Sequence, residues 1–373
     1  MMNLSKILML AIAVVASLPA AAQFRRTPTP NDTLQSVRVS PKGDVTFSIY
    51  APNAKEVRIN AECAPYGQPV KVVKNDVGVW SATIPGVKDG VYRYNFVVDG
   101  VTVQDSKDSG VANARALAVV TTDANAFFAN KDVPHGAVAQ RWYYSKPLKE
   151  MRRMHVWTPA GYEKSADKLP VLYLVHGGGD NDTSWPGVGH AGFILDNLLA
   201  EGKMVPMIVV MPNGSIDMPD GNIQGEVPVF AEDMIQSIIP YIEDNYRVLT
   251  DKDHRAMAGL SMGGMETMET ALYYPEMFSY VWVLSSSFAP GNKDKYEAER
   301  IHLKKDADRI NSNIKQLVFT QGGPEDIAYN NCKETLKLFD EAGIKYEFSE
   351  MPGGHSWHVW RHNLRDLAPR IFK

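Results

Sequence analysis

A serine stands between two glycines in the stretch Gly259-Leu260-Ser261-Met262-Gly263. An apolar run at residues 256–258 precedes it, and a segment of helical pattern follows it as far as Tyr274. A G-x-S-x-G sequence at a strand-to-helix turn is typical of a nucleophile elbow, a sharp turn that lifts the serine hydroxyl clear of a sheet. Glycines flank the serine because side chains there would collide with the neighbouring strand and helix. The sequence therefore predicts a nucleophilic serine at position 261.

Strands and helices alternate on both sides of this turn. Upstream, the pattern predicts strands at 153–156, 171–175 and 207–211 and helices at 194–201 and 231–246, the second kinked at Pro240. Downstream, it predicts strands at 280–284, 317–320 and 345–349 and a helix at 328–342 that ends at Gly343. This alternation implies a largely parallel sheet with helices on both faces, in one domain at residues 134–373.

Short strands with alternating apolar residues precede this domain. Val45, Phe47 and Ile49 alternate with polar residues, and further strands are expected at 79–84 and 91–98. Asp99-Gly100, after the last of these, is a strong signal for a hairpin turn. Short strands separated by turn residues are typical of a β-sandwich, which we expect at residues 36–125.

The first 22 residues have the pattern of a secretory signal peptide. Lys6 supplies a positive charge, residues 7–18 are mostly apolar, and small residues at 19–22 predict cleavage before Gln23. The apolar run is too short to span a bilayer. We therefore expect a secreted or periplasmic protein, with a linker at residues 23–35 ahead of the sandwich.

Composition and charge narrow the class of partner. The chain has 373 residues and a formal net charge of −4 without a long basic run, which argues against nucleic acid as the main partner. Nothing after the signal segment is apolar for long enough to span a membrane. Cys63 and Cys332 fall in different predicted domains, so we expect no disulfide between them. His358 and His362 lack the H-E-x-x-H pattern of a zinc site, and we predict neither a metal nor a cofactor.

A serine hydroxyl needs a base, and the base needs an acid that holds its tautomer. Where the serine lies on such an elbow, the acid and then the histidine follow it in sequence, each on a loop after a later strand. His355 follows the last predicted strand, in the glycine-rich stretch 352–357, and is the expected base. The expected acid is Asp326, in the loop after the strand at 317–320, with the neighbouring Glu325 as the alternative.

The tetrahedral intermediate of acyl transfer needs N–H donors for its oxyanion. One donor is expected at Met262, directly after the nucleophile. The other is expected at Gly178, in the stretch HGGGD at residues 176–180 that follows a buried strand. The alternative is a glycine-rich turn without a catalytic role, whereas a phosphate-binding loop is disfavoured because no G-K-[ST] follows. His176 is expected to have a structural role at the strand end.

Three separated motifs resemble the esterase D-type hydrolases and, more narrowly, carbohydrate esterase family 1, the feruloyl and acetylxylan esterases. These motifs are YLVHGGG at 173–179, GLSMGG at 259–264 and GGHSW at 353–357, and the likeness extends over about residues 135–373. The resemblance implies an α/β-hydrolase fold with Ser261 as nucleophile, His355 as base and Asp326 as acid. The strand GVYRYNF at 90–96, with the turn after it, resembles the immunoglobulin-like early-set domains related to carbohydrate-binding module family 48, which implies an immunoglobulin-like β-sandwich.

These motifs and the export signal together predict a secreted serine esterase that removes feruloyl or acetyl groups from plant xylan. Trp185 and Trp357 are expected to contact the substrate, because a sugar or feruloyl ring stacks well on an indole, whereas Trp360 is expected in the core. One alternative is a siderophore esterase of the enterobactin type, a group that also carries an early-set domain. The other is a polysaccharide-binding protein whose hydrolase domain is not catalytic.

Overall fold

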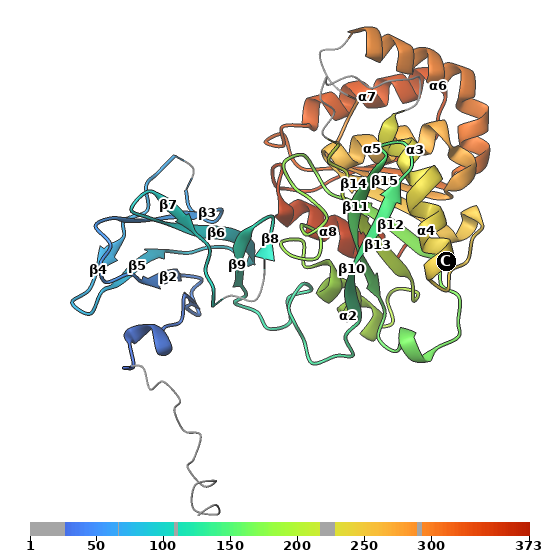
Figure 1. The fold of residues 1–373 in the computed structure, drawn as a ribbon. Helices are drawn as coiled ribbons and strands as arrows, with labels where there is room; N and C mark the ends of the chain where they lie inside the picture. Colours follow the sequence, from blue (N-terminus) through green and yellow to red (C-terminus); the bar gives the residue numbers. More distant parts are fainter. Residues whose placement is uncertain (1–26, 66, 108–110, 217–227, 289–292) are drawn as a thin grey trace, which may run out of the picture.

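The structure, a computed structural model, describes residues 27–65, 67–107, 111–216, 228–288 and 293–373. The predicted signal peptide at 1–22 lies outside the described residues, as does the start of the predicted linker. Figure 1 shows a smaller body made of strands β1 to β9 and a larger body in which helices cover a sheet. They are called here the β-sandwich (residues 37–120) and the α/β domain (residues 137–373).

The β-sandwich packs two antiparallel sheets against each other. One sheet has the order β1 (Val37–Val39), β2 (Val45–Tyr50), β5 (Val79–Ile84), β4 (Val73–Lys74). The other has the order β3 (Val57–Ala61), β6 (Gly90–Val98), β9 (Arg115–Val120), β8 (Val111–Ala112), and β7 (Val101–Val103) pairs with β6. Inward-facing residues such as Phe47 and Tyr94, whose ring centroids lie 4.8 Å apart, fill the space between the sheets. The prediction of a β-sandwich is confirmed.

The α/β domain is built on an eight-stranded sheet. Its order is β10 (Ala137–Ser145), β11 (Glu150–Thr158), β13 (Ile208–Pro212), β12 (Val171–Val175), β14 (Arg255–Leu260), β15 (Tyr280–Leu284), β16 (Gln316–Gln321), β17 (Glu347–Glu350). The strands from β13 to β17 in this order are parallel, and β10 and β11 extend the sheet in antiparallel pairing. The largely parallel sheet expected from the sequence is therefore a mixed sheet with an antiparallel edge.

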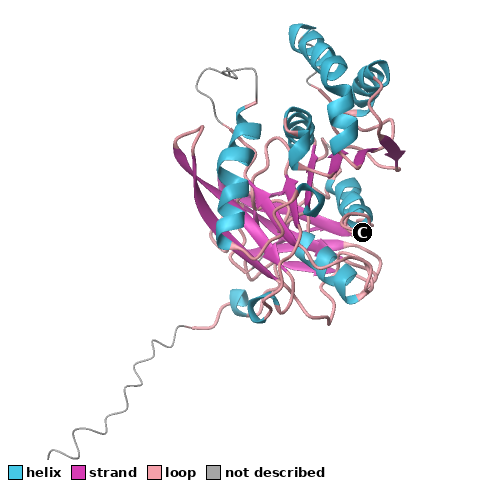
Figure 2. Ribbon diagram, turned by 90° about the vertical axis from the view of Figure 1, so that its right-hand side faces the viewer, coloured by secondary structure: helices cyan, strands magenta, loops and turns pink. Residues whose placement is uncertain are grey.

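Helices lie on both faces of this sheet, as Figure 2 shows. One face packs against α2 (Ala191–Ala200) and α8 (Trp357–Leu367). The other packs against α3 (Val229–Asp233), α4 (Ile239–Asn245), α5 (Met262–Tyr273), α6 (Lys293–Asn313) and α7 (Tyr329–Ala342). Parallel strands covered on both faces are fully buried, which explains why all five residues of β12 are apolar and buried.

In the α/β domain, three elements differ from the sequence-based expectations. The single helix expected at 231–246 is divided by a π-helical segment (Met234–Ile238), which ends two residues before Pro240. Proline lacks an N–H and cannot complete the regular α-helical hydrogen bonding at this point. Strand β10 was missed because most of its residues are exposed, and α6 was missed because it is mostly charged.

The two domains share an apolar core. Val91, Ala112 and Leu117 of the β-sandwich belong to the same buried cluster as Trp185 and Trp357 of the α/β domain. In Figure 1, β8 and β9 lie at the end of the sandwich that faces the α/β domain. The β-sandwich is therefore packed against the α/β domain through this shared core.

Two further features concern the chain as a whole. Cys63 is half-buried, Cys332 is buried, and both are free, as expected. Among the helices of the described residues, none combines the length and the apolar character needed to cross a bilayer.

Candidate active site

Ser261 lies at the sharp turn between β14 and α5. Its φ of 53° and ψ of −118° are unusual for a residue with a side chain and indicate a strained turn of the kind that active sites retain. A Cβ atom added at Gly259 would lie 2.1 Å from the Gly263 carbonyl oxygen, and one at Gly263 would lie 2.2 Å from the His176 carbonyl oxygen. Both glycines are thus required by close contacts with the backbone, as the sequence suggested.

The structure brings together Ser261, His355 and Asp326 from three separate loops. The Ser261 hydroxyl lies 2.9 Å from His355 Nε2, and His355 Nδ1 lies 2.8 Å from Asp326 Oδ1. Asp326 follows β16 and His355 follows β17, so both loops begin at the carboxyl ends of the parallel strands, as the elbow does after β14. Neighbouring Glu325 is exposed, and its Oε1 instead accepts the Gly353 N–H at 3.1 Å.

The environment of Asp326 keeps its carboxyl group ionised. Burial opposes the charge, since the residue is only 3% exposed. Hydrogen bonds from His355 and from the Ala328 N–H outweigh burial and lower the pKa of Asp326 below its ordinary value. An ionised carboxylate can only accept, so Nδ1 of His355 carries the proton and Nε2 is free to accept the serine proton. Trp360 packs edge-on against the His355 ring at 5.0 Å between centroids and fixes its orientation.

The glycine-rich loop after β12 lies against the elbow. A Cβ atom added at Gly177 would approach Ser261 Cβ to 3.2 Å, and one at Gly178 would lie 3.9 Å from Met262 Cβ. Met262 is the first residue of α5, and the first N–H groups of a helix have no acceptor within it. Gly178 and Met262 are therefore adjacent, beside the serine, where the two oxyanion donors were expected.

His176 has a structural role, as its position suggested. The ring is buried, Nδ1 donates to the Gly177 carbonyl oxygen at 2.8 Å, and Nε2 accepts the Gly214 N–H at 2.9 Å. Burial lowers the pKa of His176, so the imidazole is neutral. Its two hydrogen bonds tie the start of the glycine-rich loop to the end of β13.

A pocket of about 310 Å³ opens beside the serine. Its lining residues are Ser261, Met262, Met265, Ser285, Ser286, Ser287, Ile327, Ala328, Asn331 and His355. Ile327, directly after the acid, is 79% exposed and adds apolar surface to the pocket mouth, as Met265 does to its wall. Sequence reasoning missed Met265 and Ile327 because neither belongs to a motif, and one lies on α5 while the other lies in the loop after the acid. The one local signal was the position of Ile327 directly after the expected acid.

The expectation that Trp185 and Trp357 contact the substrate is wrong for this structure. Trp185 is 1% exposed, and its indole N–H donates to the Val175 carbonyl oxygen at 3.0 Å. Trp357 is 7% exposed and packs edge-on against Trp185, with ring centroids 5.1 Å apart. Both indoles belong to the core shared by the two domains, and so does Trp360, as expected. Their apolar area is used to pack α8 and the loop after β12, which leaves no ring face for a ligand.

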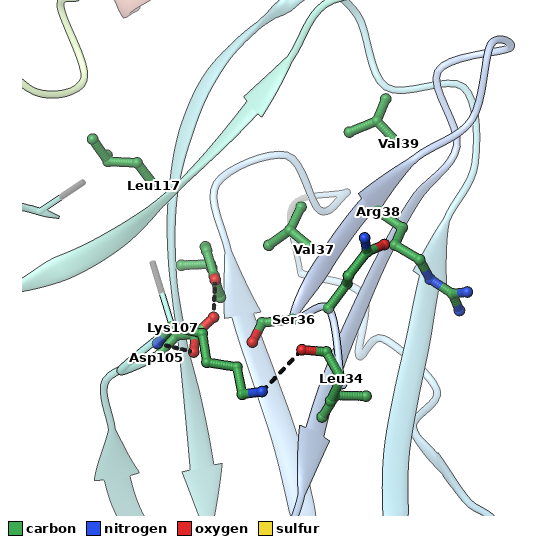
Figure 3. A pocket seen from close by; sticks show the side chains of 10 residues that line it. Leu34, Ser36, Val37, Arg38, Val39, Asp105, Lys107 and Leu117 are labelled. Atoms are coloured by element: carbon green, nitrogen blue, oxygen red, sulfur yellow. Dashed lines mark hydrogen bonds between the residues drawn. The ribbon is translucent and has the colours of Figure 1, made fainter. Parts of the chain in front are cut away.

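A second hollow, of about 660 Å³, lies in the β-sandwich beside β1 (Figure 3). The Tyr94 hydroxyl donates to Asp105 Oδ2 at 2.7 Å, and the Lys107 ammonium donates to the Leu34 carbonyl oxygen at 3.0 Å. Tyr94 is the aromatic residue among those that line it, and it is fully buried. This hollow therefore offers no exposed ring on which a sugar could stack.

No group of three or more histidine, cysteine and carboxylate side chains suited to hold a metal ion occurs within the described parts of the chain. The rings of His358 and His362 lie next to each other on α8, with centroids 4.6 Å apart and planes tilted by 52°.

Comparison with protein families matches both domains. The family model described as "Putative esterase" matches residues 145–371, and Carbohydrate-binding module 48 (Isoamylase N-terminal domain) matches residues 35–118. Among curated proteins, the chain is 35% identical over 351 residues to an endo-1,4-beta-xylanase/feruloyl esterase of Xylanibacter ruminicola. That match covers 90% of this chain and 46% of the relative, so the chain spans less than half of the relative's length.

Solved structures share the fold. A ferulic acid esterase is 27% identical with a TM-score of 0.54, and the match covers 63% of this chain and 97% of that one. The enterobactin esterase from Shigella flexneri is 16% identical with a TM-score of 0.60, over 87% of this chain and 92% of that one. The second likeness is one of fold alone, and it includes both domains. The predicted α/β-hydrolase fold preceded by a β-sandwich is confirmed.

Proposed function

Because this chain belongs to the esterase family and is a carboxylic ester hydrolase, we propose that it cleaves feruloyl or acetyl esters of plant xylan with Ser261 as nucleophile. One observation carries the mechanism: Ser261, His355 and Asp326 form a continuous hydrogen-bonded series, with distances of 2.9 and 2.8 Å, at the edge of the sheet. That series is the arrangement a serine needs to act as a nucleophile at neutral pH.

In the first half of the reaction, the Ser261 oxygen attacks the ester carbonyl while His355 Nε2 takes the hydroxyl proton. The negative charge that develops on the carbonyl oxygen is stabilised by the N–H groups of Met262 and Gly178. Asp326 holds the Nδ1–H and stabilises the imidazolium that forms. The imidazolium then protonates the leaving sugar alkoxide, and an acyl-enzyme remains on Ser261.

In the second half, a water molecule takes the place of the sugar. His355 removes a proton from this water as it attacks the acyl carbonyl, and the same two N–H groups again hold the oxyanion. The proton on His355 Nε2 returns to the Ser261 oxygen as the carboxylic acid leaves. The enzyme is thereby restored without a metal or a cofactor in any step.

The pocket beside the serine supports a ring-bearing acyl group. Its volume of about 310 Å³ lies at the lower end of the range for small-molecule sites, and Met265 and Ile327 provide apolar surface. An acetyl group would leave most of this space filled with water. The name of the Xylanibacter relative, a xylanase/feruloyl esterase, supports the same acyl group and a xylan substrate.

The decisive assay is hydrolysis of methyl ferulate beside acetylated xylan, with Ser261→Ala as control. Ferulate release that falls by about 10⁴-fold or more in the variant would support the proposal. Acetate release alone would keep the mechanism and change the acyl group. Activity that persists in Ser261→Ala would reject the mechanism itself.

We also propose that the protein is exported and that the signal peptide at residues 1–22 is removed. The support is the charged, apolar and small-residue pattern of the sequence. N-terminal sequencing of protein recovered outside the cytoplasm should begin at Gln23, and a retained Met1 would reject export by this route.

A siderophore triester is the second candidate substrate, because the fold likeness to the enterobactin esterase includes the β-sandwich. Hydrolysis of a catecholate triester, compared with a feruloylated oligosaccharide at equal concentrations, separates the two. The intact series Ser261, His355 and Asp326 argues against a purely polysaccharide-binding role.

A further inference from the structure

The tip of the β8–β9 hairpin, in the β-sandwich, contacts the loop that follows Gly178. Asn113 Nδ2 donates to the Gly179 carbonyl oxygen at 2.6 Å, and the Asn113 N–H donates to Thr183 Oγ1 at 2.9 Å. Asn113 Oδ1 accepts from Asn181 Nδ2 at 3.1 Å. One residue of the sandwich thus bonds to three residues of this loop, and the first of them is the neighbour of Gly178. Residues 176–184 are called the oxyanion loop below.

A second contact reaches the same loop from strand β6. The guanidinium of Arg93 forms an ion pair with Asp180 and donates from Nε to Glu62 Oε1 at 2.6 Å. The side chains of Arg93 and Asp180 are each about a tenth exposed, so the pair is held largely out of water. Burial opposes the charge of Arg93, but Asp180 and Glu62 outweigh it and raise the pKa of the guanidinium. The pair therefore persists throughout the neutral range and is screened little by salt.

The hairpin tip is built to present Asn113 in one orientation. Asn113 and Ala114 have φ values of 50° and 57°, and Ala112 pairs with Arg115 on either side of them. Two successive residues with positive φ form the type of tight turn that joins antiparallel strands, and asparagine tolerates this conformation better than most residues. The hairpin is anchored by Ala112, which is fully buried in the core shared with the α/β domain.

The opposite side of the oxyanion loop is fixed from within the α/β domain. Asp182 accepts from Arg153 Nε at 2.6 Å and from Arg153 Nη2 at 2.7 Å, and Arg153 belongs to β11. His176 fixes the start of the loop, as described above. Between these two anchors, residues 179–181 are held by Asn113 and Arg93 of the β-sandwich, and the Ser215 hydroxyl of the α/β domain donates to the Asp180 carbonyl oxygen at 3.2 Å. Nothing else among the hydrogen bonds described here holds the Gly179 carbonyl oxygen.

We propose that Asn113 and Arg93 of the β-sandwich are positioning residues for the oxyanion hole of the α/β domain. They hold the chain after Gly178 so that its N–H lies where charge develops in the transition state. This inference rests on the proposed function, since it assumes that Ser261 forms a tetrahedral intermediate. The β-sandwich then contributes to the chemical step itself, in addition to any contact it makes with a polysaccharide.

The kinetic consequence follows from when the oxyanion exists. The charge is present in the transition state and not in the bound substrate, so a displaced donor lowers kcat and leaves KM nearly unchanged. Loss of one oxyanion donor costs about 10²–10³-fold in kcat, and a shift of about 1 Å can cost about 10²-fold. Loss of one support of the oxyanion loop should lower kcat by less than loss of a donor does, by about 10- to 100-fold.

The test uses the full chain with Asn113→Gly, which keeps the positive φ and removes the side chain. The substrate is p-nitrophenyl acetate, which is too small to reach the sandwich, and the second probe is an aryl trifluoromethyl ketone, which forms an oxyanion when the serine adds to it. We expect kcat to fall about 10- to 100-fold, while KM stays within about twofold of the wild-type value. The inhibition constant of the ketone should rise by the same factor as that by which kcat/KM falls.

The matched control is Asn197→Ala. Asn197 also donates from its side chain to backbone carbonyl groups, those of Phe127 and Ala129, each at 2.9 Å, but it lies on α2 away from the oxyanion loop. Its kcat and ketone inhibition constant should stay within about twofold of the wild type, whatever its thermal stability. Asn113→Asp is the second test variant, because it keeps the turn and replaces the donor to Gly179 by a carboxylate oxygen, which cannot donate.

Unchanged kcat and ketone binding in both Asn113 variants would overturn the inference. So would a fall in kcat that the control reproduces, because that result would indicate a general loss of stability. A separate variant shows whether the proposed function itself fails. If Ser261→Ala retains activity, no oxyanion forms at this serine, and the positioning role of Asn113 is rejected together with the proposed function.

Discussion

Replacing Asp326 by asparagine tests the assignment of the acid most closely. Asp326 Oδ1 accepts from His355 Nδ1 at 2.8 Å, and Oδ2 is buried without a hydrogen-bond partner among the described residues. If the new amide nitrogen faces Nδ1, the imidazole must carry its proton on Nε2 and can no longer accept the serine proton. If the amide oxygen faces Nδ1, the amide nitrogen is buried where it has no acceptor, which is itself unfavourable.

The size of the effect follows from the tautomer. Replacing this acid by asparagine in serine hydrolases of the same chemistry lowers kcat by about 10⁴-fold. At about 1.36 kcal/mol for each factor of ten, this corresponds to about 5 kcal/mol of lost transition-state stabilisation. Glu325→Gln is the matched control, because glutamine keeps an oxygen that can accept the Gly353 N–H. We expect this control to lose less than about twofold.

The assay is steady-state hydrolysis of methyl ferulate by both variants, with circular dichroism to show that each is folded. Asp326→Asn should lose about 10⁴-fold in kcat and Glu325→Gln almost nothing. A larger loss in Glu325→Gln than in Asp326→Asn would refute the reasoning and move the acid to Glu325.

Three further predictions concern stability and substrate preference. Burial lowers the pKa of His190 to about 4, whereas unfolded histidine titrates near 6.5, so below that pH the unfolded state binds a proton that the folded state rejects. The free energy of unfolding of the wild type should therefore fall by about 2 kcal/mol between pH 7.5 and 5, relative to that of His190→Asn. Equal pH profiles of the two proteins in urea unfolding would contradict this. Gly263→Ala should destabilise the fold by more than about 2 kcal/mol, because its Cβ would lie 2.2 Å from the His176 carbonyl oxygen, and an unchanged melting temperature would count against the tight elbow. Ile327→Ala should raise KM for methyl ferulate several-fold without loss of stability, because the side chain is 79% exposed at the pocket mouth. The control is Ile301→Ala, since Ile301 is 59% exposed on α6, outside the pocket. Equal KM values in the two variants would show that Ile327 is not part of the site.

Local patterns in the sequence were sufficient to predict the buried parallel strands and the turn that bears Ser261. Strands β12 and β15 were predicted with their observed ends, because each is a short apolar run buried on both faces. The elbow was predictable because two glycines, a strand and a helix are all local to Ser261. Asp326 and His355 were predictable because the order of serine, acid and histidine along the chain follows from the order of the strands.

Features that depend on packing between distant segments were not predictable. Trp185 was expected to contact the substrate, yet the sandwich and α8 cover it in the fold. Strand β10 lies at the sheet edge and α6 is mostly charged, so both lack the periodic apolar residues that reveal buried elements. The contacts of Asn113 and Arg93 join segments 66 and 87 residues apart, and no local pattern in the sequence links either residue to the oxyanion loop.

Covalent labelling with a fluorophosphonate tests the central claim most directly, because this reagent reacts with a serine only when a neighbouring base activates it. Peptide mass spectrometry should find one label per chain, on the peptide that contains Ser261, and ester hydrolysis should disappear in proportion to the labelled fraction. Full labelling with hydrolysis retained, or a label on another residue, would contradict the assignment of Ser261 as the nucleophile.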